Sequence, residues 1–322
     1  MSMATGTIRR LPRSERREQI IRAAAGVFVG GGFEGTSVDD VARAAGVTRL
    51  IVYRIFESKE ALYQAVLQSV IDTGLAPTVV TFDPHPRIAL GNDVELITTL
   101  ERRLELLGGT GVETTLLASF TPELMALEPE VFADRYLRAI GVEAIAAGDD
   151  FRFGRRRQGD LALLERLGFA IIEVPRVPHV SSSAIRLALH SGDVVGAAEM
   201  LGRPYELDGI VVGGDQRGGT LGYPTANLAL EAHLVCPRYG IYAGAALEHR
   251  AALSIGTNPH YGGTEQRVEA FLLDFAGDLY GRRLVIEVWE RLRDELAFES
   301  EQALVDQIAR DVARARQARR PG

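Results

Sequence analysis

Residues 214–228 read Gly-Asp-Gln-Arg-Gly-Gly-Thr-Leu-Gly-Tyr-Pro-Thr-Ala-Asn-Leu, and this stretch carries the most informative pattern in the chain. Four glycines fall within nine residues. Because glycine has no Cβ, a glycine-rich backbone can approach a bulky anion closely, and successive main-chain amides in such a loop can surround that anion. The stretch therefore predicts a phosphate-binding loop, with a glycine hairpin that leads into a strand as the alternative.

Thr225 and Asn227 follow the glycines and offer a hydroxyl and an amide oxygen two residues apart. On an extended segment, positions i and i+2 share one face. Two hard oxygens on one face suit Mg²⁺, which takes few protein ligands and completes its shell with phosphate and water. We therefore expect Thr225 and Asn227 to bind Mg²⁺.

The glycine stretch closing on Pro-Thr-Ala-Asn resembles the riboflavin kinase signature, and further family features follow in order along residues 196–316. Pro237–Ala243 resembles the next family strand, and Val268–Phe275 resembles the strand that carries the family's catalytic Glu. Residues 206–290 are also rich in strand formers and punctuated by Gly and Pro, which favours a small antiparallel barrel. Gly219 is a departure, because the family usually has Arg there.

This resemblance implies an enzyme that transfers the γ-phosphate of ATP to the riboflavin 5′-hydroxyl and releases FMN, with Mg²⁺ as cofactor. It implies Glu269 as the catalytic base, with an exposed strand carboxylate as the alternative. It implies that Arg291, Arg293 and Glu295 bind the flavin; with Phe298, Gln307 and Ile308 they match the family's C-terminal helix. The ATP-binding residues that it implies are Gly214, Arg217, Gly218, Gly222, Thr225 and Asn227.

Residues 77–190 read as alternating strands and helices. We expect strands near residues 78–82, 114–118, 144–147 and 170–174, and helices near 100–107, 130–140 and 161–167. Such alternation favours a parallel, doubly wound sheet.

Three pieces of this middle region resemble the FMN adenylyltransferase module of bifunctional bacterial FAD synthetases: Thr81–Arg87, Gly148–Gly154 and Val180–Arg186. The last piece resembles the Ser-Ser-Thr-x-Ile-Arg motif that contacts ATP phosphates. The nucleotide-binding residues that the resemblance implies are Asp83, His85, Ser181, Ser182 and Arg186.

The family's first strand and its H-x-G-H loop are absent from this chain, because none of the six histidines forms such a pair. Those histidines would stabilise triphosphate charge during adenylyl transfer, and loss of a central strand removes ladder partners from its neighbours. We therefore expect an incomplete, Rossmann-like module that is inactive, with weak activity or a still bifunctional enzyme as alternatives. His85 is either a replacement catalytic group or, as we favour, a turn histidine.

The first 75 residues read as short helices separated by glycine turns, which is the helix-turn-helix pattern. Residues 15–30 have apolar positions at helical spacing, and Gly30-Gly31-Gly32 is expected to end that helix. Ser37 offers an N-cap for a second helix that runs to about Ala45. Thr48 is expected to cap a third helix that runs to Phe56, and residues 58–73 form a fourth.

Residues 13–67 resemble the TetR-type DNA-binding head, on a run that includes Ala45-Gly46-Val47-Thr48-Arg49. The alternative is a plain three-helix cap. Such heads bind duplex DNA as dimers, so a homodimer is a further expectation. Leu50 and Ile51 stand where the family often has small or polar residues, so we expect poor base readout. The DNA-contacting residues that the resemblance implies are Thr48, Arg49, Tyr53, Arg54 and Lys59.

The length of 322 residues predicts two or three domains, which we place at residues 1–75, 76–192 and 193–322. The net charge of −7 argues against a coat for nucleic acid, although residues 1–60 alone are mildly basic. A single cysteine, Cys236, excludes an internal disulfide. No apolar run has the length of a membrane span, so a cytoplasmic location is expected. The competing function is a flavin-responsive, DNA-binding transcriptional regulator.

Overall fold

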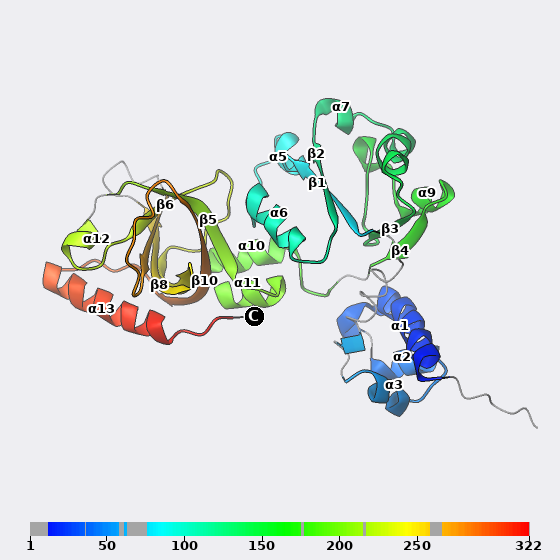
Figure 1. Ribbon diagram of the computed structural model, residues 1–322, viewed down its shortest axis with the longest axis horizontal. Coiled ribbons are helices and arrows are strands. Elements are labelled where there is room, and N and C mark those ends of the chain that lie inside the picture. The colour runs from blue at the N-terminus through cyan, green and yellow to red at the C-terminus, as the bar shows by residue number, and fades with distance from the viewer. Residues whose placement is uncertain are drawn as a thin grey trace, which may run out of the picture. The chain divides into compact units, whose positions relative to one another are not determined.

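The computed structural model describes residues 12–35, 37–57, 61–62, 76–174, 177–214, 217–257 and 266–321. The chain divides into two compact units. One consists of residues 1–89 and 111–178, and the other of residues 90–110 and 179–322 (Figure 1). The second unit includes residues 90–110 and 179–192, which we expect from the sequence to belong to the middle domain. The boundaries drawn at residues 75 and 192 stay predictions.

Three helices form the described part of the head: α1 (Arg13–Gly35), α2 (Val38–Ala44) and α3 (Arg49–Ile55). Ser37 caps α2 as expected, in a capping box with Asp40. Thr48 stands at the N-cap of α3 but accepts no side-chain hydrogen bond there. The small core includes Ile20, Val41 and Val52.

The prediction that the glycine run ends the first helix is wrong, because α1 continues through Gly30–Gly32 to Gly35. Each glycine weakens a helix by about 1 kcal/mol relative to Ala, but none blocks the backbone hydrogen bonds. The fourth helix expected over residues 58–73 lies almost entirely outside the described residues.

The α/β part of the first unit contains the four strands expected from the sequence: β1 (Thr78–Asp83), β2 (Thr114–Ser119), β3 (Ala144–Ala147) and β4 (Ala170–Glu173). The helix expected near residues 130–140 is a chain of short turns, α8 (Pro129–Phe132), a π-turn (Ala133–Leu137) and a 3₁₀ turn (Arg138–Ile140). The remaining helices are α5 (Pro86–Ala89), α7 (Pro122–Met125) and α9 (Leu161–Arg166), with a 3₁₀ turn at Arg155–Arg157.

These strands are parallel, as predicted, but among the described residues they form two separate pairs rather than one sheet. β1 pairs with β2 from Thr78↔Thr114, and β3 pairs with β4 from Ala144↔Ala170. A doubly wound sheet needs a strand that bonds to a neighbour on each side. The absence of the family's first strand, expected from the sequence, would account for this separation among the described residues.

The second unit contains a closed antiparallel barrel with the strand order β10-β5-β6-β9-β8-β7. Its strands are β5 (Tyr205–Val212), β6 (Ala226–Leu230), β7 (Gly240–Ala246), β8 (His249–Thr257), β9 (Gln266–Leu272) and β10 (Arg283–Arg293). Alternate apolar side chains point inward, so Leu207, Leu253, Ile255 and Ile286 are fully or almost fully buried in one core. The predicted barrel is therefore confirmed.

Helices surround this barrel: α6 (Leu100–Gly108), α10 (Ser182–Ser191), α11 (Val194–Leu201), the one-turn α12 (Arg217–Thr220) and the terminal α13 (Glu301–Gln317) (Figure 1). Ala315 of α13 and Ala318 beyond it pack with Trp289 and Leu292 of β10. No helix in the described part of the chain has both the length and the apolar character to cross a membrane.

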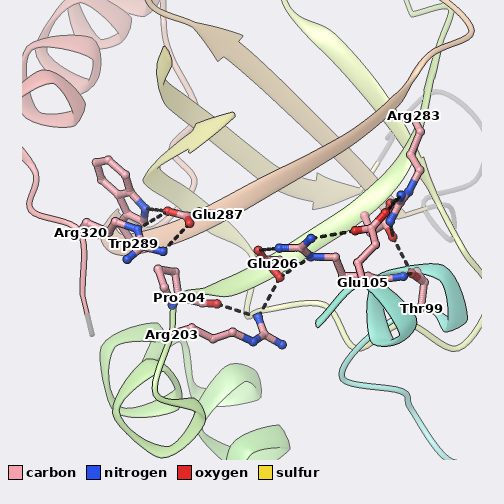
Figure 2. A network of polar contacts seen from close by, with 11 residues as sticks. Thr99, Glu105, Arg203, Pro204, Glu206, Arg283, Glu287, Trp289 and Arg320 are labelled. Atoms are coloured by element: carbon pink, nitrogen blue, oxygen red, sulfur yellow. Dashed lines mark hydrogen bonds and ion pairs between the residues drawn. The ribbon is translucent and has the colours of Figure 1, made fainter. Parts of the chain in front are cut away.

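An ion-pair network ties α6 to the barrel (Figure 2). The buried carboxylate of Glu206 accepts two hydrogen bonds from Arg102, at 2.9 and 2.6 Å. The buried carboxylate of Asp208 accepts two from Arg283, both at 2.8 Å, and one from the Thr99 hydroxyl at 2.5 Å. A hydrogen bond from Arg283 lowers the pKa of the Glu105 carboxyl on the same helix. Buried charges that are paired and fully hydrogen-bonded fix a geometry, so α6 belongs structurally with the barrel.

Candidate active site

A cavity of about 410 Å³ opens in the second unit, where the barrel strands meet α13. Aromatic and aliphatic side chains make up most of its wall, and a few polar groups converge on it, which is the composition of a small-molecule site. Tyr223 and Phe271 pack edge to face in this wall, with ring centroids 5.4 Å apart. The polar residues that line the cavity are Thr225, Ser254, Arg267, Glu269, Arg293, Glu295 and Asp311.

Thr225, Asn227 and Glu269 come together where β6 and β9 pair. Asn227 lies directly opposite Glu269 in the ladder, and the Thr225 hydroxyl donates to Glu269 Oε2 at 3.2 Å. Ser254 of β8 is the partner of Glu269 on its other side. Three neighbouring segments therefore place hydroxyl, amide and carboxylate oxygens in one cluster.

Arg267 completes this cluster, two residues before Glu269 on β9. Its Nε lies 2.5 Å from Glu269 Oε1 in an ion pair and donates a hydrogen bond to Asn227 Oδ1 at 3.1 Å. The side chains of Arg267 and Glu269 are each 25% exposed, so the pair is only partly open to solvent. The sequence reasoning missed Arg267, although its i−2 spacing from Glu269 on a strand is a signal that could have found it.

The glycine loop lies against the Thr225–Asn227 segment at distances that only glycine permits. A Cβ on Gly214 would stand 2.2 Å from Asn227 Nδ2, and a Cβ on Gly218 would stand 2.3 Å from the Tyr223 carbonyl oxygen. Gly222 adopts a φ of +85°, in the left-handed region that favours glycine. Arg217 begins α12, and its side chain lies outside the described residues.

These oxygens fit Mg²⁺ by their chemistry. Thr225, Asn227 and Glu269 offer hard oxygen ligands, and the close fit of Gly214 against Asn227 fixes the direction of the amide. No group of three or more His, Cys, Asp or Glu in the described ranges could hold a metal by itself. A site with few protein ligands is what Mg²⁺ uses when a phosphate group supplies the others.

Arg293 and Glu295 line the cavity as well. Arg293 is held by α13, because its guanidinium donates to both carboxylate oxygens of Asp311 at 2.6–3.0 Å. The Glu295 carboxylate lies so close to Gly256 that a Cβ there would stand 2.1 Å from Oε1. Asp311 was not found from the sequence, because nothing local links it to residue 293.

The structure does not place Arg291 with Arg293 and Glu295. An extra residue interrupts the β10–β7 register between Arg291 and Arg293, and this bulge directs the two side chains differently. Arg291 donates instead to the Tyr239 carbonyl oxygen and to Asp294, and it lowers the pKa of that carboxyl. The flavin-binding role predicted for Arg291 is therefore not supported by its position. The assignment of Arg291 and Arg293 to the C-terminal helix is wrong, since both lie in β10, and of the matching residues Gln307 and Ile308 lie in α13.

The residues expected to bind nucleotide in the middle region fall in both units. Asp83 ends β1, and the ring of His85 accepts a hydrogen bond from the Arg87 amide at 3.2 Å within a turn. Ser181 caps α10 by accepting from the Ala184 amide, and Ser182 is the first residue of that helix. Arg186 Nε donates to the Glu95 carbonyl oxygen at 2.6 Å. Arg186 is thus bonded to the backbone within the second unit.

The residues expected to contact DNA gather on and beside α3. Arg49 forms an ion pair with Asp39 at 2.9 Å, and its guanidinium lies 5.4 Å from the centre of the Tyr53 ring. Leu50 is 61% exposed on the same helix. Thr48 and Arg54 are exposed, and Lys59 lies outside the described residues. Asp39 therefore partly neutralises the positive charge of the surface predicted to contact DNA.

Comparison with protein families assigns a class to each part of the chain. A riboflavin kinase model matches residues 201–319, an FAD synthetase model matches residues 60–188, and a model of bacterial regulatory proteins of the tetR family matches residues 20–66. The barrel and its cavity therefore lie in a part of riboflavin kinase type.

Two similar relatives each cover about four fifths of the chain. The bifunctional riboflavin kinase/FMN adenylyltransferase of Listeria monocytogenes serovar 1/2a is 31% identical, over 82% of this chain and 90% of the relative. The enzyme of the same name from Escherichia coli K12 is 34% identical, over 81% and 90%. This chain belongs to the bifunctional riboflavin kinase/FMN adenylyltransferase family.

A solved structure agrees with this assignment at the level of the fold. A protein from Streptococcus pneumoniae described as a macrolide-efflux protein is 32% identical, with a TM-score of 0.70 over 81% of this chain and 90% of that one. The family relatives carry both activities in their names. They do not support the prediction that the adenylyltransferase module is inactive.

Proposed function

We propose that this chain phosphorylates riboflavin at its 5′-hydroxyl with ATP, giving FMN and ADP. The observation that carries the proposal is the oxygen cluster of Thr225, Asn227 and Glu269, of which Thr225 and Glu269 line the cavity in the barrel. The family match to riboflavin kinase over residues 201–319 supports the same reaction.

The chain's own residues divide the work of phosphoryl transfer, which depends mainly on positioning and charge stabilisation. The glycine loop holds the ATP phosphates against β6. Thr225 and Asn227 would hold Mg²⁺, which neutralises phosphate charge when bound. Glu269 accepts the proton of the 5′-hydroxyl while that oxygen bonds to the γ-phosphorus, and the bond from this phosphorus to the bridging oxygen of ADP breaks.

The flavin side of the cavity is its apolar wall with Arg293 and Glu295 at the edge. Phe271 and Phe298 offer aromatic surface for a planar ring, and Arg293 is oriented by Asp311. A fixed guanidinium and a carboxylate can bond to the polar edge of such a ring.

The test is an assay of purified full-length protein with riboflavin and Mg-ATP, in which riboflavin, FMN and FAD are separated. We expect FMN to form in proportion to ADP. Protein that is folded but forms neither FMN nor ADP would contradict the proposal.

The FAD synthetase match over residues 60–188 supports a second activity, adenylyl transfer from ATP to FMN. Against it stand the absent H-x-G-H loop and the separation of the strands into two pairs. We propose that this activity is lost or strongly reduced. FAD in the same assay, formed at a rate near that of FMN, would show that the module works.

A third candidate is a flavin-responsive regulator, supported by the tetR-family match over residues 20–66 and by the three-helix head. In this reading the kinase cavity senses ligand and the head binds duplex DNA. Duplex binding whose log affinity falls linearly with log salt concentration would support it. A homodimer and a cytoplasmic location stay predictions.

A further inference from the structure

Arg267 stands in the place that a divalent cation would take. Its Nε forms an ion pair with Glu269 Oε1 at 2.5 Å and donates a hydrogen bond to Asn227 Oδ1 at 3.1 Å, and Glu269 Oε2 accepts from Thr225. The guanidinium thus bonds to oxygens of the same cluster that offers ligands to Mg²⁺.

The positive charge of Arg267 in this position disfavours binding of a divalent cation at the same oxygens. Asn227 cannot direct Oδ1 at a metal while that oxygen accepts from Arg267, and Gly214 packs against the amide so closely that it has little room to turn away. The carboxylate of Glu269 is already neutralised by its ion pair. A free cation must therefore displace the guanidinium and lose part of its own hydration, which Mg²⁺ gives up reluctantly.

We propose that Arg267 acts as a resident cation, which occupies the metal site in the nucleotide-free protein and keeps the affinity for free divalent metal low. This inference rests on the proposed function, because it takes Thr225 and Asn227 as the metal ligands. In consequence the metal enters together with the nucleotide, since the phosphates add the negative charge that displaces Arg267. Before the nucleotide binds, Arg267 holds Asn227 and Glu269 in position and prevents the binding of metal without nucleotide.

The test measures Mn²⁺ binding to the nucleotide-free protein by the electron paramagnetic resonance signal of unbound Mn²⁺, which prefers the same oxygen ligands as Mg²⁺. We expect Arg267→Gln to lower the Kd for Mn²⁺ by about tenfold or more relative to the unmodified chain. Arg267→Lys retains a cation and should stay near the original Kd. Arg282→Gln is the matched control, because Arg282 is exposed and lies outside the cavity lining.

A double variant shows whether the tighter Mn²⁺ binding of Arg267→Gln takes place at this site. Arg267→Gln with Asn227→Ala should lose the gain, because the released amide oxygen is gone. Fluorescence of Trp289, the single tryptophan, verifies that each variant is folded. The proposal is overturned if folded Arg267→Gln binds Mn²⁺ no more tightly than the original chain, or if the gain persists in the double variant. Either result leaves the proposed function standing, because that function is tested by FMN formation in the kinase assay. Absence of FMN in that assay would contradict the proposed function.

Discussion

Glu269 is the residue on which the proposed chemistry depends most. Replacing its carboxylate with the amide in Glu269→Gln keeps the shape but removes the proton acceptor, so FMN formation should slow by roughly 10²–10⁴-fold. The measurement is the steady-state rate of FMN formation at saturating Mg-ATP.

The control for this substitution is Glu290→Gln, on a partly exposed strand carboxylate that does not line the cavity. It should retain the original rate. A Glu269→Gln protein with the original rate would remove Glu269 from the role of base.

In the proposed metal site, Thr225 and Asn227 each contribute one oxygen to a centre with few protein ligands. Thr225→Ala and Asn227→Ala should therefore each raise the Mg²⁺ concentration that gives half-maximal FMN formation. Thr110→Ala is the control, because the Thr110 hydroxyl bonds only locally, to the Leu107 carbonyl oxygen. Unchanged Mg²⁺ titrations in both site variants would contradict the metal assignment.

At the scale of the element, the docking of α13 builds one wall of the cavity. Arg293 of β10 and Asp311 of α13 form a bidentate pair whose side chains are only 16% and 5% exposed. Removal of one partner from a buried pair leaves an uncompensated charge, which typically costs about 3–5 kcal/mol. We expect Asp311→Ala to lower the free energy of unfolding by this amount and to weaken riboflavin binding.

Trp289 reports this change directly, because it packs with Ala315 and Ala318 at the end of α13. Its fluorescence should be followed through a urea titration. Asp306→Ala, on the exposed side of the same helix, should change stability by less than about 0.5 kcal/mol. Equal stability of the Asp311 and Asp306 variants would show that the buried pair does not anchor the helix.

At the scale of the whole molecule, we expect the incomplete α/β part to limit adenylyl transfer. Because the described strands pair only two by two and the H-x-G-H loop is absent, FMN plus ATP should give little or no FAD. The measurement is FAD yield over time beside FMN yield from riboflavin. Robust FAD synthesis would mean that another group, for which His85 is a candidate, has replaced the lost histidines.

The head should bind DNA weakly if the chain is a monomer. Residues 1–60 are only mildly basic, and Arg49 is paired with Asp39, so we expect a Kd of about 10⁻⁴–10⁻⁶ M that rises with salt. Tight binding to an operator requires two heads one helical turn apart. Light scattering beside a duplex titration tests both points. A strict monomer that binds one sequence at nanomolar Kd would refute this argument.

The sequence by itself determined the barrel, its glycine loop and the placement of Thr225 and Asn227 on one face, whereas Glu269 was identified by the resemblance to riboflavin kinases. Alternation along strands and the special backbone needs of glycine are local properties, so they can be read from spacing alone. The same local reading found all four strands of the α/β part and the Ser37 cap.

Only the tertiary structure decided which residues from distant segments join that site. Asp311 meets Arg293, and Ser254 lies beside Glu269, because barrel closure and helix docking bring together segments that share no local pattern. The bulge that separates Arg291 from Arg293 lies where Trp289 and Leu292 pack with Ala315 of α13, and no local pattern in the sequence indicates it. The association of residues 90–110 with the barrel depends on buried ion pairs such as Arg102–Glu206, whose partners stand about a hundred residues apart. Loss of one partner from such a long-range buried pair is costly, yet the pair leaves no trace in sequence spacing.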